Sequence, residues 1–197
     1  MALVKPLDEN EIETELCEFI QFFKGPLGVI PNSVRTMSRR PKVAKAFTEL
    51  NMAVMECHGS VTPEFKRIIG YITSFVSGCR YCQAHTILGS QRFGADEDRL
   101  KDAWNYENSD HFTDAEKAAL KYAHAAASIP NAVDDEIAAE LHKHWEDDDI
   151  VEITAVIALF GYLNRWNDSM GSALEDLPID AGNKYLDKTD WEIGKHK

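Results

Sequence analysis

Helical periodicity, interrupted by glycine and proline, is the feature that most constrains this chain. Apolar residues recur at the three- and four-residue spacing that lines one face of an α-helix. The first such stripe is Ile12, Leu16, Phe19, Ile20 and Phe23, ended by Gly25-Pro26. Further helices are expected over 41–59, 62–78, 79–94, 96–106, 113–128, 133–145 and 147–174. No stretch alternates as a strand does, so the predicted fold class is all-α.

Charge and composition limit the partners. The net charge of -12 disfavours nucleic acid and anionic membranes as partners. No apolar run is long enough to span a bilayer, and the acidic start lacks a signal core, so we expect a cytoplasmic protein. Four cysteines are too few for a disulfide scaffold, and in a reducing cytosol a close pair indicates catalysis or metal binding.

The chain length of 197 residues suits one compact domain. Within it we expect three parts: an N-terminal helical lead-in (1–60), a core with a cysteine helix and a long apolar helix (61–172), and a polar C-terminal tail (173–197). The tail is expected to lie over the surface or over a neighbouring subunit. The three aspartates 147–149 are most simply the cap and first-turn charge of the long helix.

The stretch GCRYCQAHT, residues 78–86, carries the chemistry. If Cys79 begins a helix, its thiolate is favoured by the helix dipole, and Arg80 adds a positive charge. Residues three apart on a helix have Cα atoms about 5–5.5 Å apart, which a disulfide can bridge. Cys79 and Cys82 could therefore be oxidised and reduced without dismantling the helix.

His85 lies about 60° around this helix from Cys82 and about 120° from Cys79. Its imidazole can take a proton from the second thiol or stabilise its thiolate. Three other interpretations stay open: buried inert thiols, a structural disulfide, and a zinc site built from Cys79, Cys82 and His85 with Cys57 or His58.

The same stretch resembles the core of the AhpD-like carboxymuconolactone decarboxylase family, closest to its peroxidase-related branch. The helix before it, EFKRIIGYITSFVS, and the segments GVIPNSVRTMSRRPKVAKAFTEL and DDDIVEITAVIALFGYLNRWNDSM are similar to family segments as well. The resemblance covers most of 26–172 and leaves the tail out. It implies an all-α, AhpD-like homo-oligomer, built from trimers or hexameric.

For function, the resemblance implies a thiol-dependent alkyl hydroperoxide reductase, an antioxidant oxidoreductase that uses no cofactor and no metal. Cys82 would attack the hydroperoxide, Cys79 would resolve the product to a disulfide, and a dithiol reductant protein would restore the pair. A general thiol-disulfide oxidoreductase and a non-enzymatic, zinc-binding or redox-sensing helical oligomer are the alternatives.

Two positions depart from the family pattern. Better-known members carry histidine four residues after the second cysteine, where this chain has Thr86, and a glutamate twelve residues before the first, where it has Arg67. Glu64, one turn earlier, is the candidate to replace that glutamate in proton transfer. Arg67 is a candidate to stabilise a thiolate or bind an anionic substrate. Asn164 and Asn167, near the end of the long apolar helix, are candidates for the substrate pocket.

Overall fold

The structure, a computed structural model, describes residues 2–197, and these contain helices and turns but no strand. The predicted all-α class is confirmed. The α-helices are α1 Thr14–Ile20, α2 Lys24–Leu27, α3 Asn32–Met37, α4 Pro41–Met55, α5 Pro63–Val76, α6 Arg80–Arg92, α7 Glu97–Asp102, α8 Asp114–Ala127, α9 Asp135–His142, α10 Asp147–Met170 and α11 Asp176–Tyr185. Short 3-10 turns lie at Glu9–Glu11, Gln21–Phe23, Ala103–Asn108, Asp187–Thr189 and Gly194–His196.

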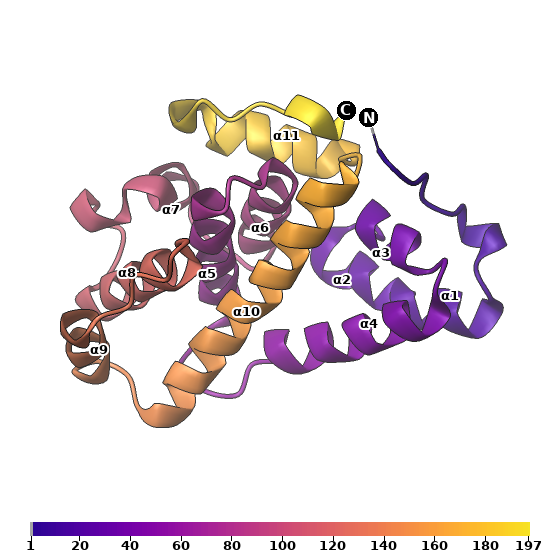
Figure 1. Cartoon of the computed structure of the whole chain (residues 1–197). Helices are drawn as coiled ribbons and strands as arrows, with labels where there is room; N and C mark the ends of the chain where they lie inside the picture. The colour runs from indigo at the N-terminus through magenta and orange to yellow at the C-terminus, as the bar shows by residue number, and fades with distance from the viewer. Residues whose placement is uncertain (1) are drawn as a thin grey trace.

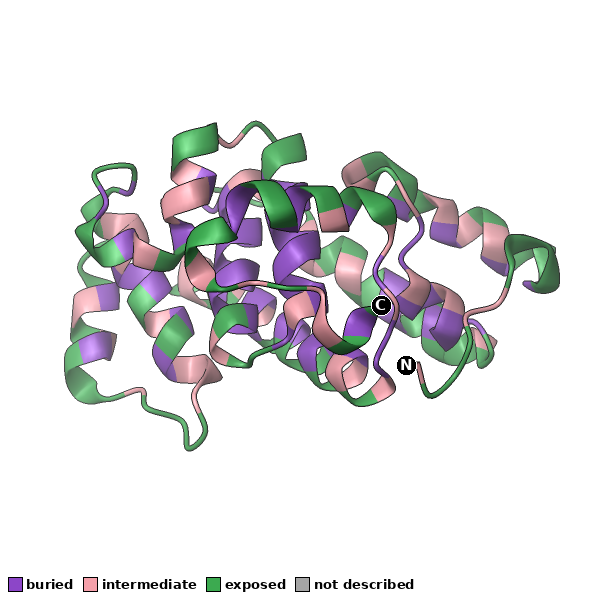
Figure 2. Cartoon of the chain, turned by 90° about the horizontal axis from the view of Figure 1, so that it is seen from above, coloured by how far each residue is buried: buried purple, intermediate pink, exposed green. Residues whose placement is uncertain are grey.

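The antiparallel pair α5 and α6 forms the centre, and the long helix α10 crosses it (Figure 1). Helices α1 to α4 lie on one side of α10, and α7 to α9 lie on the other. Seen from above, the buried residues concentrate in the central helices (Figure 2). Residues 68–74 of α5 and 81–90 of α6 are buried without interruption. The chemistry-bearing helix is therefore the most enclosed part of the molecule.

Local sequence signals set the ends of this central pair. The Thr62 hydroxyl accepts a hydrogen bond of 3.1 Å from the Phe65 amide and caps α5, with Pro63 in the first turn. Gly78 turns the chain with a φ of 72°, in the left-handed region that favours glycine. Helix α6 then starts with Cys79 as its N-cap, as the sequence predicted.

The segment after residue 172 differs from the expectation of a simple polar tail. It includes the ten-residue helix α11, which packs against α6 at the top of Figure 1. Ala181, Gly182 and Tyr185 face inward and are buried. The triple aspartate fulfils its predicted role, because Asp149 completes a capping box with Glu146 at the start of α10.

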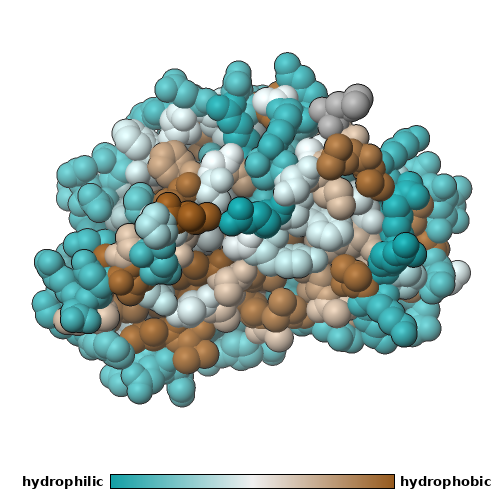
Figure 3. Space-filling model, in the orientation of Figure 1, coloured by the Kyte–Doolittle hydropathy of each residue, from teal (hydrophilic) through white to brown (hydrophobic). Residues whose placement is uncertain are grey.

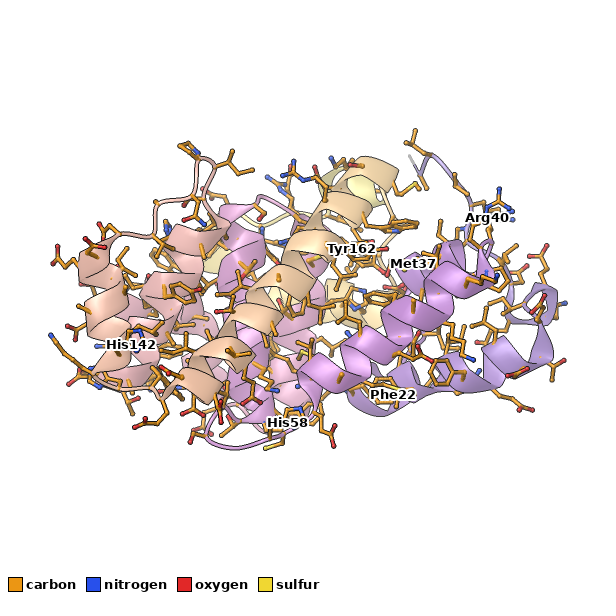
Figure 4. The ribbon with its side chains drawn as sticks, turned by 60° about the horizontal axis from the view of Figure 1, so that its bottom comes forward. Phe22, Met37, Arg40, His58, His142 and Tyr162 are labelled. Carbon is orange, nitrogen blue, oxygen red and sulfur yellow. The ribbon has the colours of Figure 1, made fainter. Side chains whose placement is uncertain are left out.

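Exposed apolar side chains lie on α4 and α10, including Val43, Leu50, Val151 and Tyr162. Figure 3 shows apolar patches on this face of the molecule, and Figure 4 shows Tyr162 beside α4. The predicted homo-oligomer stays a prediction. Within residues 2–197, every helix is too short or too polar to cross a lipid bilayer.

Gly70 allows α5 and α10 to approach closely, because a Cβ there would lie 2.6 Å from Cδ2 of Phe160. We expect Gly70→Ala to lower the free energy of unfolding by about 1–3 kcal/mol through overpacking. Gly161→Ala on α10 is the matched control, because a Cβ there meets open space. It should raise stability by about 0.5–1 kcal/mol. Urea unfolding checks both, and equal effects would contradict the packing argument.

Candidate active site

Cys82 is the sulfur that faces a cavity. The cavity lies between α2–α4 on one side and α5, α6 and α10 on the other. Its volume, taken as the space that the centres of water molecules can occupy, is about 70 Å³. Its lining is largely apolar, with Phe23, Leu27, Val34, Phe47, Phe160 and Leu163. Its polar lining includes Arg67, Tyr81, His85, Thr86 and Asn167. A small substrate with an apolar body fits such a lining.

The Cys82 thiol is buried, and burial, followed by the neighbouring Cys79 thiol, raises its pKa well above the usual value. Asn167 acts in the opposite direction, since its Nδ2 donates a hydrogen bond of 3.4 Å to the Cys82 sulfur. The resting Cys82 is therefore a neutral thiol, and a base has to take its proton before it can attack.

His85 is the candidate for that base, because it lines the same cavity as Cys82. Its Nε2 lies 2.7 Å from Oε2 of Glu175, and its Nδ1 is buried without a hydrogen-bond partner among the described residues. Because an ionised Glu175 can only accept, Nε2 carries the hydrogen and Nδ1 keeps its lone pair. The imidazole is held by a carboxylate on one side and free to take a proton on the other, at the wall of the Cys82 cavity.

Glu175 is the partner of His85 that the sequence analysis did not find. Its carboxylate also accepts hydrogen bonds from Tyr81 Oη, at 3.1 Å, and from the Asn32 amide. Burial alone would raise the pKa of Glu175, but the neighbouring His85 and the Asn32 amide lower it overall. In the sequence, Glu175 is visible only as an acid at the start of a short helix in the tail. That position does not indicate that its partner is His85, 90 residues away.

Glu64 occupies a different environment from the one predicted. It forms an ion pair of 2.9 Å with Arg99, which also binds Glu116, and it is not among the residues that line the Cys82 cavity. Its side chain is thereby committed to holding α5, α7 and α8 together. The proton-transfer role expected for Glu64 is corrected: the carboxylate beside His85 is Glu175.

Arg67 does line the cavity, as expected for a pocket residue. It is buried, stacks over Phe93 with its guanidinium carbon 3.7 Å from the ring centroid, and donates to the Pro63 carbonyl. Burial lowers its pKa to about 10, so it remains a cation at neutral pH. The nearby charge of Glu64 acts in the opposite direction and favours the charged form of Arg67.

The two asparagines of α10 lie in different surroundings. Asn167 lines the cavity and contacts Cys82, whereas Asn164 donates to the Thr73 carbonyl at 3.4 Å and borders another hollow with Arg165 and Asp168. The pocket role expected for Asn164 is corrected. Three residues along a helix leave about 60° between side chains and about 4.5 Å along the axis, and here the two amides meet different partners.

The zinc set considered from the sequence is not brought together. Cys57 is exposed, and the His58 ring contacts the Ala53 carbonyl at 2.9 Å. Within residues 2–197, one group of three potential metal ligands lies close together: Cys79, Asp168 and His196 have ligand atoms within 4.8 Å of one another. Cys79 and Cys82 are not joined by a disulfide in this structure.

The sequence profile of the carboxymuconolactone decarboxylase family matches residues 41–125. The chain is also 31% identical to the debrominase Bmp8, over 93% of this chain and 97% of that one, and the two structures superpose with a TM-score of 0.85. The chain belongs to the carboxymuconolactone decarboxylase family. This confirms the resemblance noted in the sequence, and it places the chain in a family that includes enzymes.

Other comparisons extend this result. A Bmp8 variant with one cysteine changed to alanine, solved with 2,3,4-tribromopyrrole, superposes with a TM-score of 0.88 at 30% identity, covering 94% of this chain and 98% of that one. An AhpD-core, peroxidase-related protein from Ralstonia eutropha JMP134 is 22% identical, with a TM-score of 0.77 over 90% of this chain and 94% of that one, and shows the AhpD-like fold. The uncharacterized protein YnjA of Escherichia coli K12 is 32% identical over 47% of this chain, and the match spans half of YnjA.

We expect Glu175→Gln to lower the free energy of unfolding at pH 7 by about 1–3 kcal/mol, because it weakens a charge-assisted hydrogen bond. The lowered pKa means that this stabilisation is present above the ordinary carboxyl pKa and is lost as the pH falls through the folded value. The difference between wild type and variant should therefore shrink below about pH 4.5.

Urea unfolding between pH 7 and pH 3 measures this difference. Glu97→Gln is the control, since Glu97 pairs with Lys101 and Lys184 at the surface. Its loss should change the free energy of unfolding little. A difference that is as large at pH 3 as at pH 7 would show that the charge of Glu175 is not what stabilises the fold.

Proposed function

We propose that the chain is a two-electron thiol reductase for small hydroperoxides, using Cys82 and Cys79. The observation that carries this proposal is the Cys82 sulfur at the wall of a largely apolar cavity, with a second thiol beside it and a carboxylate-bound histidine on the same wall. Hydroperoxides are electrophilic at oxygen, and thiolates attack them without a metal or an organic cofactor. The expected cytosolic compartment would keep the pair reduced between turnovers.

The first step forms the sulfenic acid. His85 takes the Cys82 proton on Nδ1, and Asn167 stabilises the thiolate by its hydrogen bond. The thiolate attacks the outer oxygen of ROOH, the O–O bond breaks, and the departing alkoxide takes the proton back as ROH. Arg67 is the cation available to hold a polar or anionic end of the substrate. Cys82 is left as Cys–SOH.

The second step closes the disulfide. The Cys79 sulfur attacks the Cys82 sulfur, the S–O bond breaks, and water leaves, so that one hydroperoxide and two thiols give an alcohol, water and a disulfide. A dithiol reductant then returns two electrons and two protons by exchange through a mixed disulfide. Small disulfides would use the same pair, so relative rates with the two substrate classes decide between peroxidase and disulfide reductase.

We expect Cys82→Ser to slow consumption of tert-butyl hydroperoxide by more than about 100-fold, because the attacking sulfur is gone. Cys79→Ser should still consume one equivalent and stop at a sulfenic acid that dimedone traps. Both are made in a Cys17→Ser, Cys57→Ser background, so that only the pair is counted. Peroxide loss at the wild-type rate in the Cys82 variant would rule out this mechanism, and stoichiometric zinc on the purified protein would favour the metal-binding alternative.

Reductive debromination is the second candidate, favoured by similarity to Bmp8 over nearly the whole chain. The Cys82 thiolate would attack bromine, the C–Br electrons would remain on carbon, and carbon would take a proton. Cys79 would then displace bromide from the S–Br bond, giving the same disulfide.

Bromide release from 2,3,4-tribromopyrrole in the presence of dithiothreitol tests this candidate. For a peroxidase we expect release at least about tenfold slower than the turnover of tert-butyl hydroperoxide. Bromide release that is faster than the turnover of tert-butyl hydroperoxide, and that is lost in Cys82→Ser, would make debromination the function.

A further inference from the structure

The penultimate residue, His196, is fixed in the interior by its backbone and its ring. Its side chain is 1% exposed. Its carbonyl accepts a hydrogen bond of 2.8 Å from the Leu174 amide, and its ring Nδ1 lies 2.8 Å from the Ser172 carbonyl. A carbonyl can only accept, so Nδ1 carries the hydrogen and Nε2 keeps its lone pair.

The His196 ring lies close to the other sulfur of the pair. Nε2 of His196 is buried with no hydrogen-bond partner among residues 2–197. Nε2 lies 3.8 Å from Oδ1 of Asp168, and one ring nitrogen of His196 lies within 4.8 Å of the Cys79 sulfur. Burial lowers the pKa of His196, which keeps the ring neutral and able to accept a proton. Cys79 is fully buried, so no water at its surface can take its proton instead.

We propose that His196, from the C-terminal tail, is the general base of the resolving cysteine. The inference rests on the proposed function, because it concerns the step in which Cys79 attacks oxidised Cys82. The Cys79 S–H proton moves to Nε2 as the S–S bond forms, and it is then delivered to the hydroxide that leaves Cys82, giving water. Each cysteine therefore has its own histidine: His85 serves Cys82 and His196 serves Cys79.

The charges around His196 suit a transient imidazolium. Asp168, on α10, is the carboxylate that faces Nε2, and Lys195 binds the same carboxylate at 2.8 Å. The Tyr81 ring packs against the imidazole from α6, with centroids 5.8 Å apart. Asp168 stabilises the protonated ring once the proton has moved, and Lys195 limits that stabilisation, so the ring returns to its neutral form after the step.

The test isolates the resolving step from any peroxide. In the Cys17→Ser, Cys57→Ser background, one equivalent of methyl methanethiosulfonate places a methylthio group on Cys82. Attack by Cys79 releases methanethiol and leaves the internal disulfide, which quenched samples reveal by mass spectrometry. His196→Asn is the informative variant, because an asparagine amide can keep the hydrogen bond to the Ser172 carbonyl while providing no base.

We expect His196→Asn to slow disulfide closure by about 100-fold at pH 7, with the rate recovering as the pH rises and hydroxide replaces the missing base. Methylthiolation of Cys82 should stay within about twofold of the starting chain. Asp168→Asn, which removes only the stabilising charge, should slow closure by about tenfold. His142→Asn is the matched control, because His142 lies far from the site at the end of α9 and should change neither rate (Figure 4).

Closure at the wild-type rate in His196→Asn would overturn the proposal. So would a slowing that stays the same at every pH, which indicates packing, or one metal ion per chain that is lost in this variant, which indicates a ligand. If wild type closes the disulfide quickly but ignores hydroperoxides, the peroxidase function fails while the role of His196 stands.

Discussion

The buried carboxylate of Glu175 is the interaction on which the site depends. Removing a carboxylate from water costs several kcal/mol unless donors replace the water. Here three donors do so, from His85, Tyr81 and the Asn32 amide. They come from α6 and from the start of α3, while Glu175 caps α11. One acid thus fixes the tail, the lead-in and the cysteine helix relative to one another, and it sets the tautomer of the histidine at the cavity.

The two thiols are three residues apart, yet their surroundings differ. Cys82 faces a cavity with an amide donor and the His85–Glu175 pair, whereas Cys79 is enclosed against His196 and Asp168. A helix produces this asymmetry by itself, because three residues leave an angle of about 60° between side chains. Under the proposed function, the substrate would meet Cys82 only, and Cys79 would act in the intramolecular step.

Local patterns predicted the local features. Caps and glycine breaks located α5 and α6, and the spacing of Cys79 and Cys82 indicated an oxidisable pair at a helix start. The proton-handling partners could not be found in this way, because Glu175 and His196 reach the site only after the chain folds back. The polar composition after residue 172 indicated a surface tail. The few apolar residues in this segment did not predict that α11 packs against α6.

The two departures from the family pattern, a histidine one residue early and an arginine in place of a glutamate, both lie at the Cys82 cavity. Moving the imidazole by one residue rotates it by about 100° around α6. At position 85 it turns to the side covered by the start of α11, where Glu175 meets it. At position 67, the buried arginine places a positive charge at the cavity.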